Sequence, residues 1–99
     1  MSTTVYGGFE WNDKAAELNL TICGVSFVDA ATVFGSDDAF YFGNDSESYV
    51  VGYALDGSKL TVRFEWTSAR FGSGRIRILD ARPALASEWA FWQAWQGRP

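Results

Sequence analysis

A run of strictly alternating apolar and polar residues constrains the fold of this chain more than any other feature. The run is segment 59–67, KLTVRFEWT, whose apolar members are Leu60, Val62, Phe64 and Trp66. A period of two predicts a β-strand with one face on a core and the other toward solvent. Segment 75–82, RIRILDAR, begins in the same way, with isoleucines alternating against arginines. We expect the two strands to pair antiparallel, because a slip of one residue would bring arginines into the core.

The matched apolar faces predict a register for this pair. They place Phe64 opposite Ile76 or Ile78, and they place Glu65 opposite the first or second arginine of segment 75–82. The residues expected to form a polar cluster on the other face are Arg63, Glu65, Arg75 and Arg77.

The alternation breaks after Ile78, since a strict period of two would drive Asp80 into the core beside it. A β-bulge near Leu79–Asp80 would avoid this placement and would redirect Arg82. For Asp80 itself the favoured interpretation is a buried or bulge-capping acid.

The remaining segments complete an α+β fold: two N-terminal helices, a four-stranded, mainly antiparallel twisted sheet, and a C-terminal helix. Asn12 and Gly24 are expected to begin and end the first helix, with a buried stripe that includes Leu18 and Ile22. Ser26 is expected to begin the second helix. The other predicted elements are a short strand at 5–11, strands at 39–42 and 48–55, an Asp-Gly turn at 56–57, and a last helix starting at Pro83.

Composition predicts one cytoplasmic domain, 1–99, without cofactor, metal or membrane segment. Cys23 is the single cysteine and cannot form an internal disulfide, which favours a reducing compartment. The net charge of −4 counts against a generic nucleic-acid-binding protein. The charge is unevenly distributed, because nine acids and one base lie in residues 1–58, whereas residues 59–99 contain three acids and seven bases.

Several motifs, in order, resemble the BrnT family of type II toxins, which are ribonucleases with a RelE-like α+β fold. The matching stretches are FEWNDK (Phe9 to Lys14), NLTICGVSF (Asn19 to Phe27), AATVFG (Ala30 to Gly35) and RIRILDAR (Arg75 to Arg82). Glu88 matches a glutamate of the family's last helix. The chain departs from the family where Ile22-Cys23 replaces Lys-His and where Asp80 replaces a serine.

The resemblance implies an RNA-cleaving site in which Arg75, Arg77 and Arg82 bind the phosphate, Arg63 assists, and Glu88 or Glu65 transfers protons. Arginines suit phosphate and developing negative charge, but they stay protonated and are poor general bases. The chain has no histidine, so the base must be a carboxylate, a perturbed Lys or Tyr, or a positioned water. The structural alternative is that the arginines and Glu65 form ordinary cross-strand salt bridges.

Two further hypotheses concern partners other than RNA and a cognate antitoxin. An acidic, catalytically inactive binding protein, such as a phage-encoded inhibitor of the anti-CRISPR type, would block a basic nucleic-acid-binding partner. Its acidic surface would comprise Asp29, Asp37, Asp38, Asp45 and Glu47. The last helix offers a partner-binding surface or homodimer seam through Trp89, Phe91, Trp92 and Trp95. We expect two of these four aromatic residues to pack on the sheet instead.

Overall fold

The computed structural model describes residues 2–44, 47–67 and 74–96, which form one six-stranded sheet with three helices. The strands are β1 (Thr3–Tyr6), β2 (Phe9–Asn12), β3 (Phe40–Gly43), β4 (Ser48–Tyr53), β5 (Lys59–Thr67) and β6 (Arg75–Pro83). The helices are α1 (Asp13–Cys23), α2 (Phe27–Val33) and α3 (Ala86–Gln96). The strand order is β1-β2-β6-β5-β4-β3, in which β2 and β6 are parallel and the other neighbours are antiparallel.

The expectation of a four-stranded, mainly antiparallel sheet is wrong, although the chain is broadly α+β. Segment 5–11 is not one strand, because the chain turns at Gly7–Gly8 and forms the β1–β2 hairpin. Gly7 has a φ of 59°, a conformation that glycine adopts without strain. Strand β2 then joins β6 in parallel and makes the sheet mixed. The last helix also begins later than expected, because Pro83 is the final residue of β6.

The register of β5 and β6 agrees with the sequence pattern. Phe64 lies opposite Ile78, and Glu65 lies opposite Arg77. Between Phe64 and Arg63 the register shifts by one residue, so that Leu79 has no counterpart on β5. This β-bulge restores the alternation of faces, because an extra residue in one strand reverses the direction of the side chains after it.

The two N-terminal helices begin and end at the expected residues. The Asn12 side chain accepts a hydrogen bond from the Ala15 N–H at 3.0 Å, and Gly24 ends α1 with a φ of 72°. The Ser26 hydroxyl accepts one from the Asp29 N–H at 3.1 Å and caps α2. Each cap satisfies backbone groups that a helix terminus leaves without an intrahelical partner.

The predicted apolar stripe of α1 is correct only in part, because Ala15, Ala16 and Cys23 pack against the core, but the fully buried residue of this helix is Asn19. Leu18 is 48% exposed and Ile22 is 76% exposed. The Asn19 amide donates hydrogen bonds of 2.8 Å to the carbonyls of Val25 and Ala81, and its oxygen accepts one from the Ala81 N–H at 3.1 Å. Asn19 thereby joins α1 to β6 and to the start of α2.

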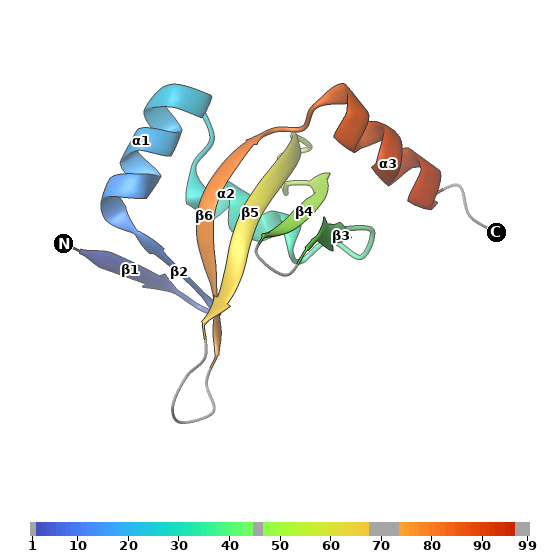
Figure 1. The fold of residues 1–99 in the computed structure, drawn as a ribbon. Helices are drawn as coiled ribbons and strands as arrows, with labels where there is room; N and C mark the ends of the chain where they lie inside the picture. The colour runs from blue at the N-terminus through green and yellow to red at the C-terminus, as the bar shows by residue number, and fades with distance from the viewer. Residues whose placement is uncertain (1, 45–46, 68–73, 97–99) are drawn as a thin grey trace.

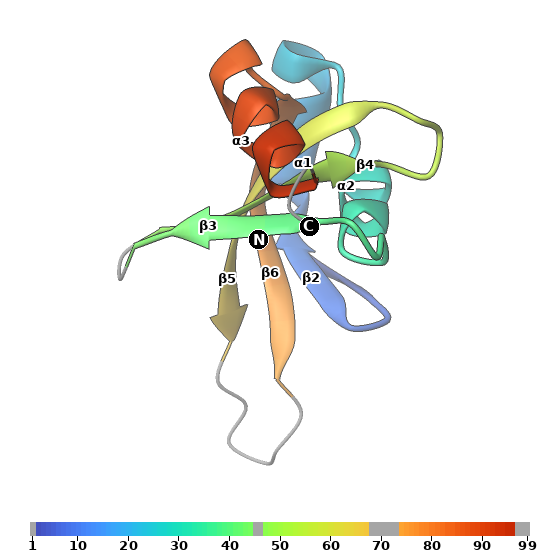
Figure 2. The ribbon, with the colours of Figure 1, turned by 90° about the vertical axis from the view of Figure 1, so that its right-hand side faces the viewer.

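The core lies between the sheet and the first two helices. Its buried members include Trp11, Phe27, Ala30, Val33, Val50, Val62, Phe64 and Ile78. Figure 1 shows α2 behind β5 and β6, with α1 and α3 toward opposite sides of the sheet. In Figure 2 α3 is nearest to the viewer, above β3. The sheet therefore has one face covered by α2 and a second face that α3 covers only at one end.

Within the described ranges no single helix is long and apolar enough to cross a membrane. Among the described helices, α1 and α2 taken together have that length and composition, but the chain bends by 88° between them. Most of α2 is buried in the core, where Phe27, Ala30 and Val33 contact the sheet.

We expect Asn19→Ala to lower the free energy of unfolding by about 3 kcal/mol, because it leaves buried backbone groups of Val25 and Ala81 without partners. Urea denaturation at neutral pH measures this change. The matched control is Thr21→Ala, which removes an exposed hydrogen bond to the Glu17 carbonyl on the same helix. Equal losses in the two variants would contradict the anchoring role of Asn19.

Candidate functional site

Charged side chains gather on the sheet face opposite α2. We call this surface the arginine face, and its members are Glu10 of β2, Arg63 and Glu65 of β5, Arg77, Asp80 and Arg82 of β6, and Glu88 of α3. Residues paired across neighbouring strands share a face, and the register pairs Arg63 with Asp80, Glu65 with Arg77 and Thr61 with Arg82. The bulge at Leu79 is what keeps both halves of β6 in this alignment.

Arg82 and Glu88 form the least exposed ion pair of the arginine face. The two terminal guanidinium nitrogens lie 2.6 Å from the two carboxylate oxygens, which is a bidentate geometry. The Arg82 and Glu88 side chains are 34% and 13% exposed. Glu88 also accepts hydrogen bonds from the Thr61 hydroxyl at 3.0 Å and from the Leu85 N–H at 2.8 Å. The contact with Leu85 caps the start of α3, as glutamate does three residues into many helices.

These contacts determine the charge state of Glu88. Burial by itself would raise its pKa, but the hydrogen bonds from Arg82, Leu85 and Thr61 outweigh burial and hold the pKa below its ordinary value of 4.5. Glu88 is therefore ionised at neutral pH and is in the form that accepts a proton.

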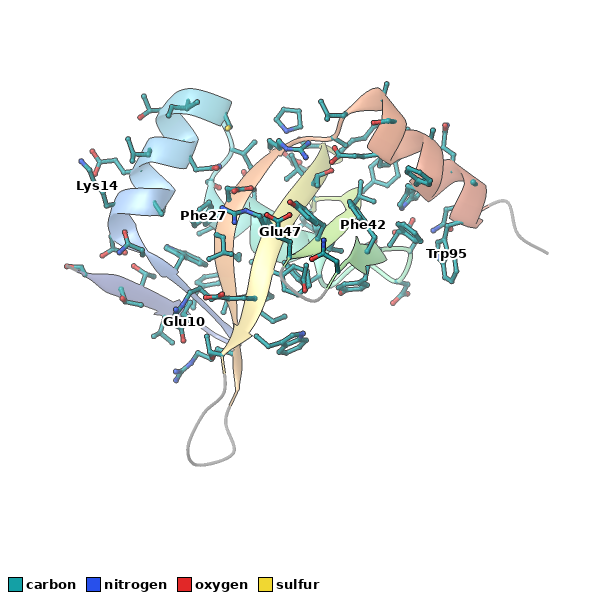
Figure 3. All side chains as sticks on the ribbon, in the orientation of Figure 1. Glu10, Lys14, Phe27, Phe42, Glu47 and Trp95 are labelled. Atoms are coloured by element: carbon teal, nitrogen blue, oxygen red, sulfur yellow. The ribbon has the colours of Figure 1, made fainter. Side chains whose placement is uncertain are left out.

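The other two ion-paired arginines are more exposed. The Arg63 Nε lies 2.7 Å from Asp80, and the side chains are 36% and 42% exposed. Arg77 lies between two acids, at 2.9 Å from Glu10 and 3.3 Å from Glu65. Figure 3 shows Glu10 on the β2 side of the sheet. The hydrogen bond to Asp80 raises the pKa of Arg63, and the hydrogen bond to Glu10 raises that of Arg77.

The arrangement permits phosphate binding by exchange. Exposed ion pairs stabilise a protein by about 0–1 kcal/mol, so an incoming phosphate can replace a carboxylate on an exposed guanidinium. Glu65 is the best candidate for replacement, since its side chain is 51% exposed and its contact with Arg77 is long. Tyr49, which lies opposite Arg63, borders the same face. A hydrogen bond to Glu47 raises the pKa of Tyr49, so its phenol stays protonated.

The structure brings together five of the six residues predicted for RNA binding and cleavage. They are Arg63, Glu65, Arg77, Arg82 and Glu88. Arg75 lies opposite Thr67 near the end of β6, where its backbone forms two hydrogen bonds with the Thr67 hydroxyl. In the part of the chain that the structure describes, the Arg75 side chain makes no ion pair.

Two acids of the arginine face were missed or misread in the sequence. Asp80 is neither buried nor confined to the bulge, because it points to the same side as Arg63 and forms an ion pair with it. No sequence pattern indicated a role for Glu10, because its partner Arg77 is 67 residues away along the chain. The one feature that could have indicated a role in the sheet is the position of Glu10 in β2, between Phe9 and Trp11.

Three of the four aromatic residues of α3 contact the sheet, one more than expected, because Trp95 packs on Phe40 of β3 with ring centroids 5.5 Å apart. The rings of Trp89 and Trp92 are stacked with centroids 4.3 Å apart, and both contact Tyr53 edge-on. The Trp92 indole N–H donates a hydrogen bond of 2.8 Å to the Asp38 carbonyl. Phe91 and Trp95 are 66% and 46% exposed.

Of the acids proposed as a partner-binding surface, Asp29 and Glu47 are exposed, and Glu47 accepts a hydrogen bond from Tyr49 beside the arginine face. Asp37 is exposed, whereas the Asp38 carbonyl serves as an anchor for α3. Asp45 lies outside the described residues. Among the described side chains, no group of three or more His, Cys, Asp or Glu is placed to bind a metal ion.

We expect the Arg82–Glu88 pair to make stability depend on pH. The folded pKa of Glu88 lies below the unfolded value of 4.5, so the pair contributes stability that is fully present above pH 4.5 and is lost as the pH falls through the folded pKa. Glu88→Gln should unfold at lower urea concentration than the wild type at pH 7, and the difference should shrink as the pH falls below 4.5. Glu17→Gln, an exposed acid of α1, is the control, and a pH-independent difference for Glu88→Gln would contradict the assignment.

A comparison with protein-family models and a comparison with curated proteins find no match to this chain. The arginine face and the ordered sequence motifs are therefore the observations on which a function can be proposed.

Proposed function

We propose that this chain is a ribonuclease toxin of a toxin–antitoxin pair, which binds an RNA phosphate on the arginine face. The observation that carries the proposal is the convergence of Arg63, Arg77 and Arg82 on one face of the sheet, beside carboxyl groups. The motif order that resembles the BrnT family supports the same reading. Arg75, two residues before Arg77 on β6, extends the row of guanidinium groups toward the end of the strand.

The proposed reaction is cleavage by the neighbouring 2′-hydroxyl. A carboxylate takes the 2′-hydroxyl proton, the 2′-oxygen forms a bond to phosphorus, and the bond from phosphorus to the 5′-oxygen breaks. The products are a 2′,3′-cyclic phosphate and a 5′-hydroxyl, which receives its proton from an acid. Arginines that contact the non-bridging oxygens stabilise the charge that develops on them.

Two glutamates of the arginine face are candidates for the base. Glu88 is ionised, but Arg82, Thr61 and Leu85 occupy its oxygens, and its lowered pKa makes it a weak base. Glu65 is half exposed, and its one ion pair in the described part of the chain is the long contact with Arg77. We assign the base to Glu65 and the positioning of Arg82 to Glu88. Tyr49 keeps its proton at neutral pH and is the candidate acid.

A second candidate function has a specific observation in its favour. The three ion-paired arginines face four carboxylates, which leaves this set with a net charge of −1. Residues 1–58 add an excess of acids, of which Asp29, Asp37 and Glu47 are exposed. A chain of this charge could occupy the nucleic-acid site of a basic protein as a non-enzymatic inhibitor.

We expect purified protein to cleave single-stranded RNA and Arg77→Ala to lower the cleavage rate by about 100-fold, because it removes a ligand of the transition-state phosphate. Arg82→Lys should also lower the rate, since lysine retains the charge but not the bidentate geometry. Gel analysis of a labelled RNA measures both effects. Lys14→Ala, which removes an exposed base on α1, is the matched control.

Absence of cleavage by the wild type, at micromolar protein and with folding verified by circular dichroism, would exclude the ribonuclease. Binding of a basic nucleic-acid-binding protein that weakens in Asp29→Asn and Asp37→Asn, but not in Arg77→Ala, would then favour the inhibitor.

A further inference from the structure

An aromatic pocket lies beside the arginine face, at the point where β4 begins. It has a volume of about 390 Å³ and is lined mainly by Tyr41, Phe42, Tyr49, Phe64 and Trp66. The pocket exists because Ser48, the first residue of β4, pairs with Phe64, and β5 continues past it to Thr67. The end of β5 thus runs beyond β4 and leaves Trp66 69% exposed.

The pocket is built from both faces of the sheet. Phe42 and Tyr49 are cross-strand partners on the face of Arg63, and their rings are stacked, with centroids 5.2 Å apart and an angle of 11° between the planes. Phe64 and Trp66 come from the opposite face and meet edge-on at 6.5 Å. Figure 3 shows Phe42 on the β3 side of the sheet. Flat rings from two directions suit a flat ligand, because aromatic groups bind one another by offset stacking and edge contacts.

The pocket is adjacent to a phosphate-binding group. Tyr49 pairs across the sheet with Arg63, and paired side chains have Cβ atoms about 4.5–5.5 Å apart. Among the described residues, the ion-pair partner of Arg63 is the half-exposed Asp80, which a phosphate can replace. A ligand with a planar ring and an attached anionic group would therefore contact the pocket and Arg63 together. An unpaired nucleotide has both parts, and proteins bind single strands by stacking bases on aromatic side chains beside basic residues.

The tryptophans of α3 are less suited to this task. Trp89 is buried, and the hydrogen bond from the Trp92 indole N–H to the Asp38 carbonyl fixes that ring beside Tyr53. The stacking surface thus lies at the β3–β4 hairpin and the end of β5.

We propose that this aromatic pocket binds one unpaired base of a single-stranded RNA, with the phosphate of that nucleotide on Arg63. The inference rests on the proposed function and adds the substrate class: RNA in which a base is free to leave its stack. Tyr49 lines the pocket and borders the arginine face, and so connects the two.

The test measures fluorescence anisotropy of a labelled five-nucleotide RNA with 2′-O-methyl groups, which prevent cleavage. Trp66→Ala and Tyr49→Ala should each weaken binding about tenfold, because each removes a stacking surface. Tyr49→Phe keeps the ring and should bind like the wild type. Phe91→Ala, which removes an exposed aromatic side chain on α3, is the control. An RNA with an abasic centre and a fully paired duplex should bind the wild type more weakly than the five-nucleotide RNA.

The outcomes separate this inference from the proposed function. If the wild type binds the RNA and Arg77→Ala weakens binding, but Trp66→Ala, Tyr49→Ala and the abasic RNA leave the affinity unchanged, the pocket is not a base site and the ribonuclease proposal stands. If the wild type binds no RNA, both proposals are overturned.

Discussion

The pairing of β5 with β6 is the constraint on which the rest of the structure depends. It sets Phe64 against Ile78 on the core side and Glu65 against Arg77 on the other. The extra residue Leu79 lets one strand keep Ile78 in the core while Asp80 and Arg82 point away from it. Without the bulge the charges of β6 would be divided between the two faces, and the core would contain an unpaired acid, which is costly. One inserted residue therefore separates the core from the charged surface.

The charged side chains of the arginine face form ion pairs with one another. Arg63 holds the half-exposed Asp80, and Arg77 holds the half-exposed Glu65 together with the buried Glu10, whereas the Arg82–Glu88 pair ties α3 to the sheet. Such a division suits a binding face, because the enclosed pair fixes the geometry while the exposed pairs can change partners. In the proposed ribonuclease, proton transfer falls to carboxylates and to Tyr49, because the chain has no histidine. Proton transfer by such groups works best when their pKa values lie near the working pH, so this site would be slower than one with a histidine.

The sequence predicted what depends on local pattern. The alternation in 59–67 was enough to place Glu65 opposite Arg77, and the caps at Asn12, Gly24 and Ser26 were read correctly because capping is a local interaction. The errors concern contacts between distant segments. Asn19 was not among the residues expected to be buried, since nothing near it in the sequence indicates a hydrogen bond to the Ala81 backbone, 62 residues away.

The same reasoning explains the errors in the sheet and the site. Gly7–Gly8 was taken as part of one strand at 5–11, although two glycines also permit a tight turn. The parallel pairing of β2 with β6 depends on that turn, and no pattern in the sequence indicates it. Glu10 was missed and Asp80 was misplaced for the same reason: tertiary structure, and not spacing along the chain, determines their ionic partners.

The attachment of β2 to β6 has a mechanical consequence. The two strands are paired at only two positions, Phe9 with Ile76 and Glu10 with Arg77, so the hairpin is held to the sheet by a short seam. The ion pair between Glu10 and Arg77 lies on this seam and reinforces it. A ligand that draws Arg77 to itself removes that reinforcement. When a ligand occupies Arg77, the hairpin is therefore held to the sheet by these two paired positions and by Trp11, which is buried in the core.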